Sequence, residues 1–175
     1  MASKRSDAKQ NREHLITIAK SLARKGVVPS FNELAKAAEV GVGTVYRHFA
    51  DEKALLSAMA EDDLAAFRTE LESAARIEDP SDALEAALRG AVKMVLQRPS
   101  VATLLATTPR EFKALSGIVE QVVTRAKKAR VLKYDLDAND FRRLICGIEY
   151  AAHAGDKPAE AAERYLTVML SGLRR

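Results

Sequence analysis

Apolar residues recur at three- and four-residue steps along most of this chain, which is the spacing of amphipathic helices. The first such stripe lies between Asp7 and Lys25, and Gly26 marks its predicted end. The sequence has no alternation of period two and no Asn-Gly or Asp-Gly hairpin signal, so it predicts an all-α fold with about nine helices. The stripes are Leu15, Ile18, Ala19 and Leu22; Leu84, Leu88, Val92 and Val95; Leu115, Ile118, Val122 and Val123; Phe141, Leu144, Ile145 and Ile148; Tyr165, Leu166, Met169, Leu170 and Leu173.

Helix-start signals separate these stripes. Ser30 and Glu33 form a capping box, in which the serine hydroxyl and the glutamate carboxylate each accept a hydrogen bond from a free backbone N–H. Proline at a first helical position is a similar signal, because its missing N–H is not needed there. Four further starts are predicted at Asp79-Pro80, Thr108-Pro109, Asp137 with Asp140, and Asp156-Lys157-Pro158.

The positive charge is unevenly distributed. The chain has 175 residues, of which 47% are hydrophobic, enough for one compact domain or two small ones. Its formal net charge of +4 lies entirely in residues 1–60, and the rest of the chain is neutral. This asymmetry favours a segment that faces nucleic acid joined to a neutral body, although a mildly basic, solvated helix surface would give the same balance.

Composition argues against several other classes of protein. Apolar runs are far shorter than the ~20 residues of a membrane helix, and no apolar segment of a signal peptide follows the charged N-terminus, so we expect a cytoplasmic protein. Cys146 is the only cysteine and the histidines are dispersed, so we expect no disulfide, metal or cofactor. The sequence has no G-x-S-x-G, H-E-x-x-H or phosphate-binding loop, which argues against an enzyme.

The segment from residue 30 to 53, SFNELAKAAEVGVGTVYRHFADEK, has the pattern of a helix-turn-helix. Its two helices must cross closely, so small Ala35 is expected at their contact, with Leu34, Val40 and Val45 filling the wedge between them. With Val45 turned inward, the second helix presents its remaining side chains outward, and it is narrow enough for the major groove. These outward residues are Val42, Gly43, Thr44, Tyr46, Arg47 and His48.

The run GTVYRHF at 43–49, followed by DEKAL at 51–55, is very similar to the recognition-helix signature of the TetR family of bacterial transcriptional regulators and to the start of that family's fourth helix. Weaker resemblance covers residues 133–144 and 164–174, whereas residues 79–130 match only in helix pattern. The resemblance implies a three-helix DNA-binding domain at 1–53 and a helical ligand-binding and dimerisation domain at 54–175.

Two residues depart from the family's pattern. Glu39 stands at the turn position where the family often has glycine, and a left-handed backbone there costs a non-glycine residue about 1–2 kcal/mol, so the turn is expected to be either slightly strained or differently wound. Gly41 stands where serine commonly caps the recognition helix, and glycine caps only a few tenths of a kcal/mol less well.

The resemblance also assigns roles at the DNA. It implies that Tyr46 and His48 contact backbone phosphates, that Lys53 adds a third such contact, and that Thr44 lies at the groove. Arg47 is suited to donate two hydrogen bonds to guanine. Lys4 and Arg5 are either a minor-groove arm or a plain tail. The expected DNA-facing set is Ser30, Val42, Gly43, Thr44, Tyr46, Arg47, His48 and Lys53.

One recognition helix covers too few base pairs to select a site among genomic competitors, so a homodimer on a near-palindromic operator is expected. By resemblance, the last two helices form the dimer interface. Its expected residues are Leu144, Ile148, Ala151, Tyr165, Leu166, Met169, Leu170 and Leu173.

The neutral body is expected to enclose a pocket for a small-molecule effector that releases a repressor from its operator. The alternative is a DNA-binding dimer without an effector, whose body serves dimerisation or protein docking. Candidate pocket residues are Met94, Leu105, Phe112, Val119, Cys146 and Tyr150.

Overall fold

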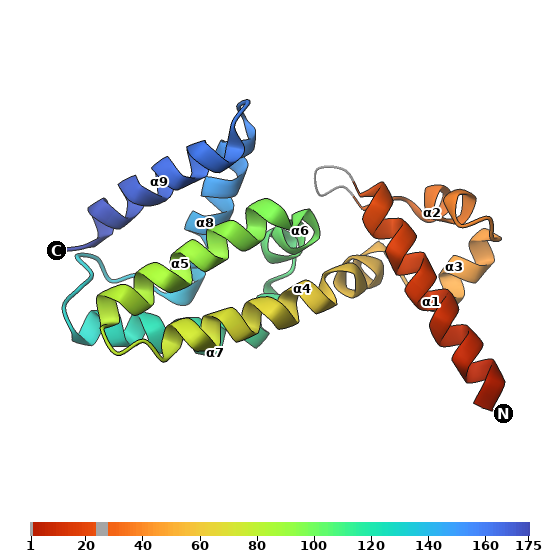
Figure 1. Ribbon diagram of the computed structural model, residues 1–175, viewed down its shortest axis with the longest axis horizontal. Helices are drawn as coiled ribbons and strands as arrows, with labels where there is room; N and C mark the ends of the chain where they lie inside the picture. Colours follow the sequence, from red (N-terminus) through yellow and green to blue (C-terminus); the bar gives the residue numbers. More distant parts are fainter. Residues whose placement is uncertain (1, 24–27) are drawn as a thin grey trace.

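The computed structural model describes the backbone of residues 2–23 and 28–175, and the side chains of these residues except 2–7, 109–111 and 114. The described chain is built from α-helices joined by short connections, which confirms the predicted all-α fold (Figure 1). The helices are α1 (Ala2–Leu22), α2 (Phe31–Ala37), α3 (Val42–His48), α4 (Glu52–Ala75), α5 (Pro80–Gln97), α6 (Pro99–Thr107), α7 (Pro109–Lys128), α8 (Ala138–His153) and α9 (Pro158–Leu173). None of these helices is long and apolar enough to cross a membrane.

Most helix-start signals act as predicted. Asp79 caps α5 by accepting hydrogen bonds from the backbone N–H groups of Ser81 and Asp82. Asp137 and Asp140 form a capping box at α8. Other starts differ: Thr108 makes no side-chain cap although α7 begins at Pro109, and the N-cap of α9 is Lys157 rather than Asp156.

The first helix is also longer than its apolar stripe. α1 begins at Ala2, before the predicted start at Asp7, and ends at Leu22. Gly26, its predicted end, lies outside the described residues.

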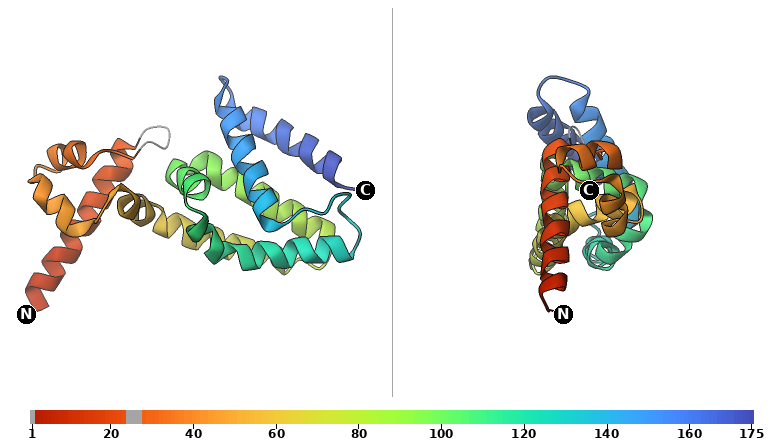
Figure 2. Two further views of the ribbon diagram at one scale, coloured as in Figure 1. Left: turned by 180° about the vertical axis from the view of Figure 1, so that it is seen from behind. Right: turned by 90° about the vertical axis from the view of Figure 1, so that its right-hand side faces the viewer.

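Two hydrophobic cores share α4. Leu55 and Met59 belong to a core with residues of α1, α2 and α3, whereas Leu56 and Ala60 belong to a larger core with residues of α5–α9. Figures 1 and 2 accordingly show α1–α3 at one end of the molecule and α5–α9 around the other end of α4. We call these parts the N-terminal unit and the C-terminal body.

The far end of α4 is held by one side chain of α7. The guanidinium of Arg125 donates hydrogen bonds to the carbonyl oxygens of Ala75 (2.6 Å), Ile77 (2.7 Å) and Glu78 (2.8 Å). The Ala75 carbonyl is in the last turn of α4, where it has no partner within the helix, and the Ile77 and Glu78 carbonyls follow in the connection to α5. This half-buried arginine therefore holds the end of α4 and the start of that connection.

The last residues of the described chain, Leu173 to Arg175, hold α9 in place in a similar way. Lys133 donates its backbone N–H to the Leu173 carbonyl (2.8 Å), and Arg175 donates to the Val131 carbonyl (3.0 Å). The side chain of Arg174 reaches α5, where it pairs with Glu85 at 2.6 Å. This tail therefore sets the position of α9 relative to the rest of the body.

We expect Arg125→Met to lower the free energy of unfolding by about 2–3 kcal/mol, because three carbonyl oxygens lose their hydrogen bonds from a charged donor at a half-buried site. In a chain of this size that corresponds to a fall in Tm of roughly 4–12 °C, measured by circular dichroism. Lys128→Met, at an exposed position of the same helix, is the matched control and should change stability by less than about 0.5 kcal/mol. A loss no larger than the control's would contradict this role.

Candidate nucleic-acid interface

The helix-turn-helix begins with the predicted capping box. The Ser30 hydroxyl accepts a hydrogen bond from the backbone N–H of Glu33 (3.3 Å), and the Ser30 N–H donates to the Glu33 carboxylate (2.8 Å). The Ser30 side chain and backbone hydrogen bonds hold the pKa of Glu33 below its ordinary value. The box is therefore complete at neutral pH, and its contribution is lost as the pH falls through that lowered pKa.

The turn between α2 and α3 depends on a left-handed residue. Glu39 has φ 55°, which is the strained, left-handed one of the two alternatives expected at this position. This conformation lets the Val40 N–H bond to the Ala35 carbonyl (3.0 Å) and the Glu39 N–H bond to the Lys36 carbonyl (3.3 Å). These two bonds are a Schellman motif, which stops α2 and turns the chain into α3.

The inner side of the motif follows the predicted pattern with one exception. Leu34 and Val45 are fully buried, and Ala35 is buried with them in the core of the N-terminal unit. Val40, predicted to fill the wedge, is instead 37% exposed. It follows the left-handed residue, whose turn directs the chain away from the core, so the prediction for Val40 is wrong.

The outer side of α3 is open to solvent. Tyr46 is 60% exposed, and its ring packs edge-on against buried Phe31 with centroids 4.9 Å apart. This contact leaves the phenol facing outward on a fixed support. Val42, Gly43 and Arg47 are exposed, and Thr44 and His48 are half-buried at the sides of the helix.

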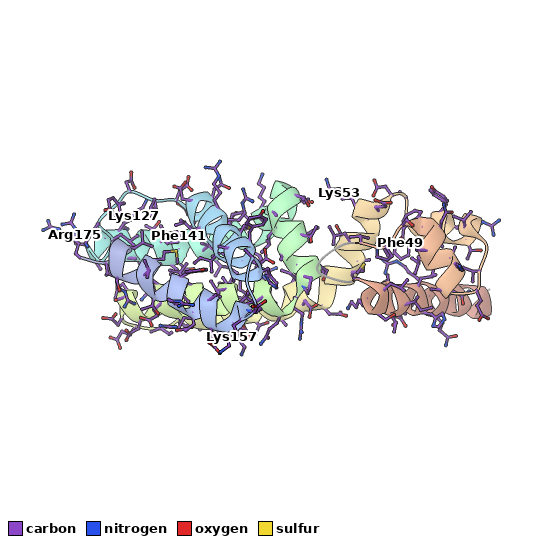
Figure 3. The ribbon with its side chains drawn as sticks, turned by 90° about the horizontal axis from the view of Figure 1, so that it is seen from above. Phe49, Lys53, Lys127, Phe141, Lys157 and Arg175 are labelled. Atoms are coloured by element: carbon purple, nitrogen blue, oxygen red, sulfur yellow. The ribbon has the colours of Figure 1, made fainter. Side chains whose placement is uncertain are left out.

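A buried phenylalanine ends the recognition helix. Phe49 lies inside the N-terminal unit (Figure 3), and the Cζ atom of Arg12 on α1 lies 5.3 Å from the centroid of its ring. This contact ties α1 to the end of α3. Arg12 was not among the sequence candidates, because its partner is distant along the chain.

The start of α4 presents a cation beside α3. Asp51 caps α4 by accepting a hydrogen bond from the Ala54 N–H (2.7 Å). Lys53 is exposed in the first turn and points outward (Figure 3). Ser30, by contrast, is half-buried, and its side chain is engaged in the capping box. The side chains of Lys4 and Arg5 lie outside the described residues.

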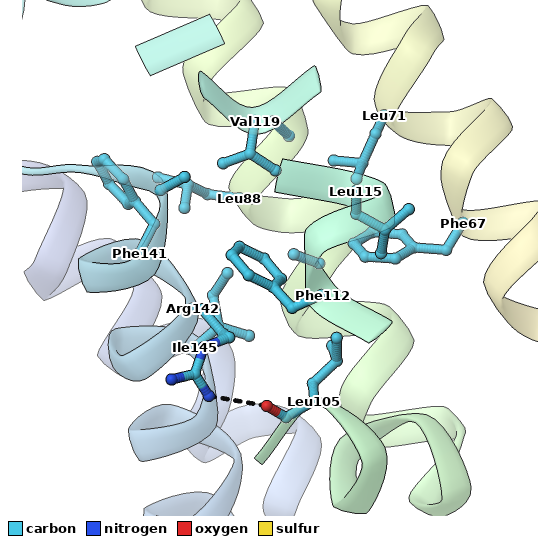
Figure 4. A pocket seen from close by; sticks show the side chains of 13 residues that line it. Phe67, Leu71, Leu88, Leu105, Phe112, Leu115, Val119, Phe141, Arg142 and Ile145 are labelled. Atoms are coloured by element: carbon cyan, nitrogen blue, oxygen red, sulfur yellow. Dashed lines mark hydrogen bonds between the residues drawn. The ribbon is translucent and has the colours of Figure 1, made fainter. Parts of the chain in front are cut away.

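The C-terminal body contains an apolar cavity of about 40 Å³ (Figure 4). Of the predicted pocket residues, Leu105, Phe112 and Val119 line it, whereas Met94 and Cys146 are half-buried elsewhere in the core. Tyr150 is 79% exposed and borders a surface groove between α6 and α8. The cavity is lined by Phe67, Leu71, Ala87, Leu88, Ala91, Leu105, Phe112, Leu115, Val119, Ala138, Phe141, Arg142 and Ile145.

Sequence reasoning missed Arg142 in this lining. The signal was present, because Ala138, Arg142 and Ile145 are spaced by four and three residues and share one face of α8. The described residues contain no cluster of three potential metal ligands.

The last two helices divide the predicted interface residues into two sets. Ile148, Leu166, Leu170 and Leu173 are buried in the core of their own chain. Leu144, Ala151 and Tyr165 are exposed, and Met169 is half-buried. Val168, which was not among the candidates, is 67% exposed on α9.

A capped helix, a Schellman turn and a short second helix with one buried and one open side define a helix-turn-helix DNA-binding protein. A family model for the C-terminal domain of SbtR-like transcriptional regulators matches residues 79–175, more than half of the chain. A second model, for bacterial regulatory proteins of the tetR family, matches residues 18–59. The chain belongs to the TetR family of bacterial transcriptional regulators.

Relatives and solved structures agree with this assignment. An HTH-type transcriptional regulator of Staphylococcus aureus (strain USA300) is 40% identical over 67 residues, which cover 37% of this chain and only 36% of that relative. The fold is similar to a TetR-family regulator from Pectobacterium atrosepticum (TM-score 0.68, 18% identity, 97% of each chain). It is also similar to AibR in complex with isovaleryl coenzyme A and operator DNA (TM-score 0.67, 18% identity, 94% of this chain and 98% of AibR).

We expect Glu39→Gly to raise the free energy of unfolding by roughly 1 kcal/mol, because glycine adopts the left-handed conformation without a steric cost. Thermal unfolding should shift upward by about 2–4 °C. Ala38→Gly is the matched control: Ala38 has φ −87°, so glycine brings no relief there and should lower stability. A Glu39→Gly protein no more stable than the parent would show that the turn carries no strain.

Proposed function

We propose that this transcriptional regulator is a repressor that binds a near-palindromic operator as a homodimer and is released by a small-molecule effector. The observation that carries the proposal is the division of α3, with Val45 fully buried and the Val42, Tyr46 and Arg47 side open to solvent. A short helix held this way fits the major groove. Acting on the chromosome implies a cytoplasmic location.

The proposed domain boundary follows the DNA-binding role. We assign residues 1–53 to DNA binding and residues 54–175 to ligand binding and dimerisation. The boundary lies in the first turn of α4, which begins at Glu52, and the two hydrophobic cores on either side support the division. Because α4 is shared, the two domains are joined by a helix and not by a flexible linker.

The roles proposed at the DNA follow from exposure and support. Tyr46, held on Phe31, and His48 contact phosphates, and Lys53 adds a cation at the start of α4. Thr44 lies at the groove, and exposed Arg47 donates two hydrogen bonds to a guanine. Gly43 lets the backbone come close, since nothing lies within 4 Å of a Cβ placed there. Ser30 contributes by fixing α2, and Val42 offers an apolar contact to a base.

The proposed dimer interface contains only the exposed residues of the apolar stripes on α8 and α9, together with Val168. Leu144 and Ala151 on α8, with Tyr165 and Val168 on α9, are exposed apolar residues of two helices that pack side by side. Exposed apolar side chains gathered on two neighbouring helices favour a partner surface there. The buried members of the stripes support these helices from within. A second copy places two recognition helices about one DNA turn apart, ~34–36 Å.

Effector binding is supported by the apolar cavity, since ligand sites are concave and mostly apolar. The AibR structure, with a small molecule and operator DNA together, supports the view that this fold accommodates both. The alternative, a dimer without an effector, predicts that no small molecule changes operator affinity.

Mutations should distinguish the residues that contact bases from those that contact phosphates. We expect Lys53→Ala to weaken binding to all sequences about equally and to reduce the slope of log K against log salt by about 1. Arg47→Ala should instead change the sequence recovered from a random pool, with a loss of roughly 1–3 kcal/mol at one base pair. Lys157→Ala, at an exposed lysine in the C-terminal body (Figure 3), should do neither. If the Arg47→Ala protein selects the same DNA sequence as the parent, Arg47 does not take part in base recognition.

The dimer interface is tested by placing a charge in it. Val168→Asp should give a monomer in sedimentation velocity at concentrations where the parent is a dimer, because a carboxylate buried between two copies has no partner. Operator affinity should fall with it. Ala159→Asp puts the same charge at an exposed position in the first turn of α9 and should leave the dimer intact. A parent protein that is monomeric both free and on operator DNA would disprove the dimer.

A further inference from the structure

The cavity of the C-terminal body has one charged residue among the thirteen described residues that line it (Figure 4). The other twelve carry hydrocarbon side chains, including the rings of Phe67, Phe112 and Phe141. The guanidinium of Arg142 lies beside the backbone of Leu105 and not in the apolar interior. We call this part of the lining, formed by Arg142 and the Leu105 backbone, the rim. An occupant must therefore have an apolar part inside, and any polar part must lie at this rim.

All hydrogen-bond partners of this guanidinium among the described residues are neutral. Its Nε atom donates to the Asn139 Oδ1 atom (3.0 Å), and its Nη1 atom donates to the Leu105 carbonyl (2.8 Å). The Cζ atom lies 5.7 Å from the ring centroid of Phe112. No described carboxylate lies within the 4.0 Å limit of an ion pair with Arg142, and Nη2 has no acceptor among the described residues.

The neighbouring arginine shows the difference. Arg143, one residue further along α8, is exposed and pairs with Asp140 at 3.7 Å. Arg142 is half-buried and has no such counter-ion among the described side chains. A partly desolvated guanidinium with unused N–H donors gains strongly from a carboxylate, which accepts two parallel hydrogen bonds from it.

We propose that the effector is a small aromatic monocarboxylate, whose ring enters the cavity while its carboxylate binds Arg142 at the rim. This inference rests on the proposed effector-responsive function and names the ligand class of that site. An aromatic body matches walls that already contain three phenylalanine rings. Arg142, the single cation among the described lining residues, provides for one negative charge.

The size of the cavity restricts the ligand further. Its volume of about 40 Å³ is far below the ~150 Å³ of a cavity that holds benzene, so the walls must open to admit a ring. Sites for drug-sized molecules occupy about 300–1,000 Å³. We therefore expect a ligand of the size of one ring with a short acidic chain, and not a fused polycyclic ligand.

Carboxylate binding also has a structural consequence. Arg142 is the donor to the Leu105 carbonyl, which belongs to the second half of α6. A carboxylate that accepts hydrogen bonds from the remaining N–H groups of Nη1 and Nη2 shares Nη1 with this carbonyl. The group that binds the ligand is thus also one attachment of α6 to α8.

The test uses the purified full-length protein and three acids: benzoate, phenylacetate and 3-phenylpropanoate, each with its primary amide. Calorimetry should show that at least one acid binds about tenfold tighter than its amide, the effect of one hydrogen bond to a charged group. The same acid should release the protein from DNA selected from a random pool, followed by fluorescence anisotropy. Equal affinities for acid and amide, or no binding of any acid at about 1 mM, would overturn the proposal.

Variants test whether Arg142 is the residue that makes the protein bind the acid more tightly than the amide. Arg142→Met should reduce the ratio of acid to amide affinity to within about twofold, because the charge and the paired donors are gone. Arg143→Met, its exposed neighbour, should keep the ratio of the parent. If circular dichroism shows Arg142→Met unfolded, Arg142→Lys decides: it keeps the charge without the planar donors and should lower the ratio at least about threefold. An unchanged ratio in the folded Arg142 variant overturns the assignment.

Failure of this inference is distinguishable from failure of the proposed function. DNA binding is measured first on the protein without ligand. Intact DNA binding with no discrimination between acid and amide overturns the ligand class alone. Absence of sequence-selective DNA binding overturns the repressor function itself, whatever the acids do.

Discussion

The packing of one helix into two hydrophobic cores is the constraint on which the rest of the structure depends. In α4, Leu55 and Leu56 are neighbours in sequence but belong to different cores, because successive residues of a helix differ by about 100° in direction. The 24 residues of α4 form a rod of roughly 36 Å. Since α4 starts four residues after α3 ends, the direction of this rod sets the direction of the recognition helix.

The recognition surface is held by contacts behind it. α2 and α3 have seven residues each, well below the ~12–15 residues that an isolated helix needs to be even marginally stable in water. Their stability therefore comes from the Ser30 capping box, the Schellman turn at Glu39, and the burial of Val45 and Phe49. Because these contacts lie on the inner side, the outer residues of α3 are free to vary with the DNA sequence without loss of the fold.

Features set by neighbouring residues could be predicted from the sequence, and features set by distant contacts could not. The caps at Ser30, Asp79 and Asp137 are local chemistry, and the structure confirms them, whereas only the structure decides that the turn at Glu39 is left-handed. The three carbonyls bound by Arg125 and the cavity beside Arg142 bring together residues far apart in the chain. A stripe of period 3.6 likewise cannot say whether Leu166 faces its own core or a partner. Only the packing shows that Leu166 is buried while Val168 is exposed.

The position of α6 shows where a signal from the cavity would have to be carried. A ligand that moves an equilibrium from 1:99 to 99:1 must favour one state by about 5.5 kcal/mol. The ion pair between Arg98, just before α6, and Asp63 of α4 is half-exposed, and such pairs contribute at most about 1 kcal/mol. Val101 and Leu104 of α6 are fully buried, and exposing either side chain to water would cost about 1.5–3 kcal/mol. The packing of these two residues, more than the ion pair, therefore has the energetic scale to couple the cavity to α4 and the recognition helix.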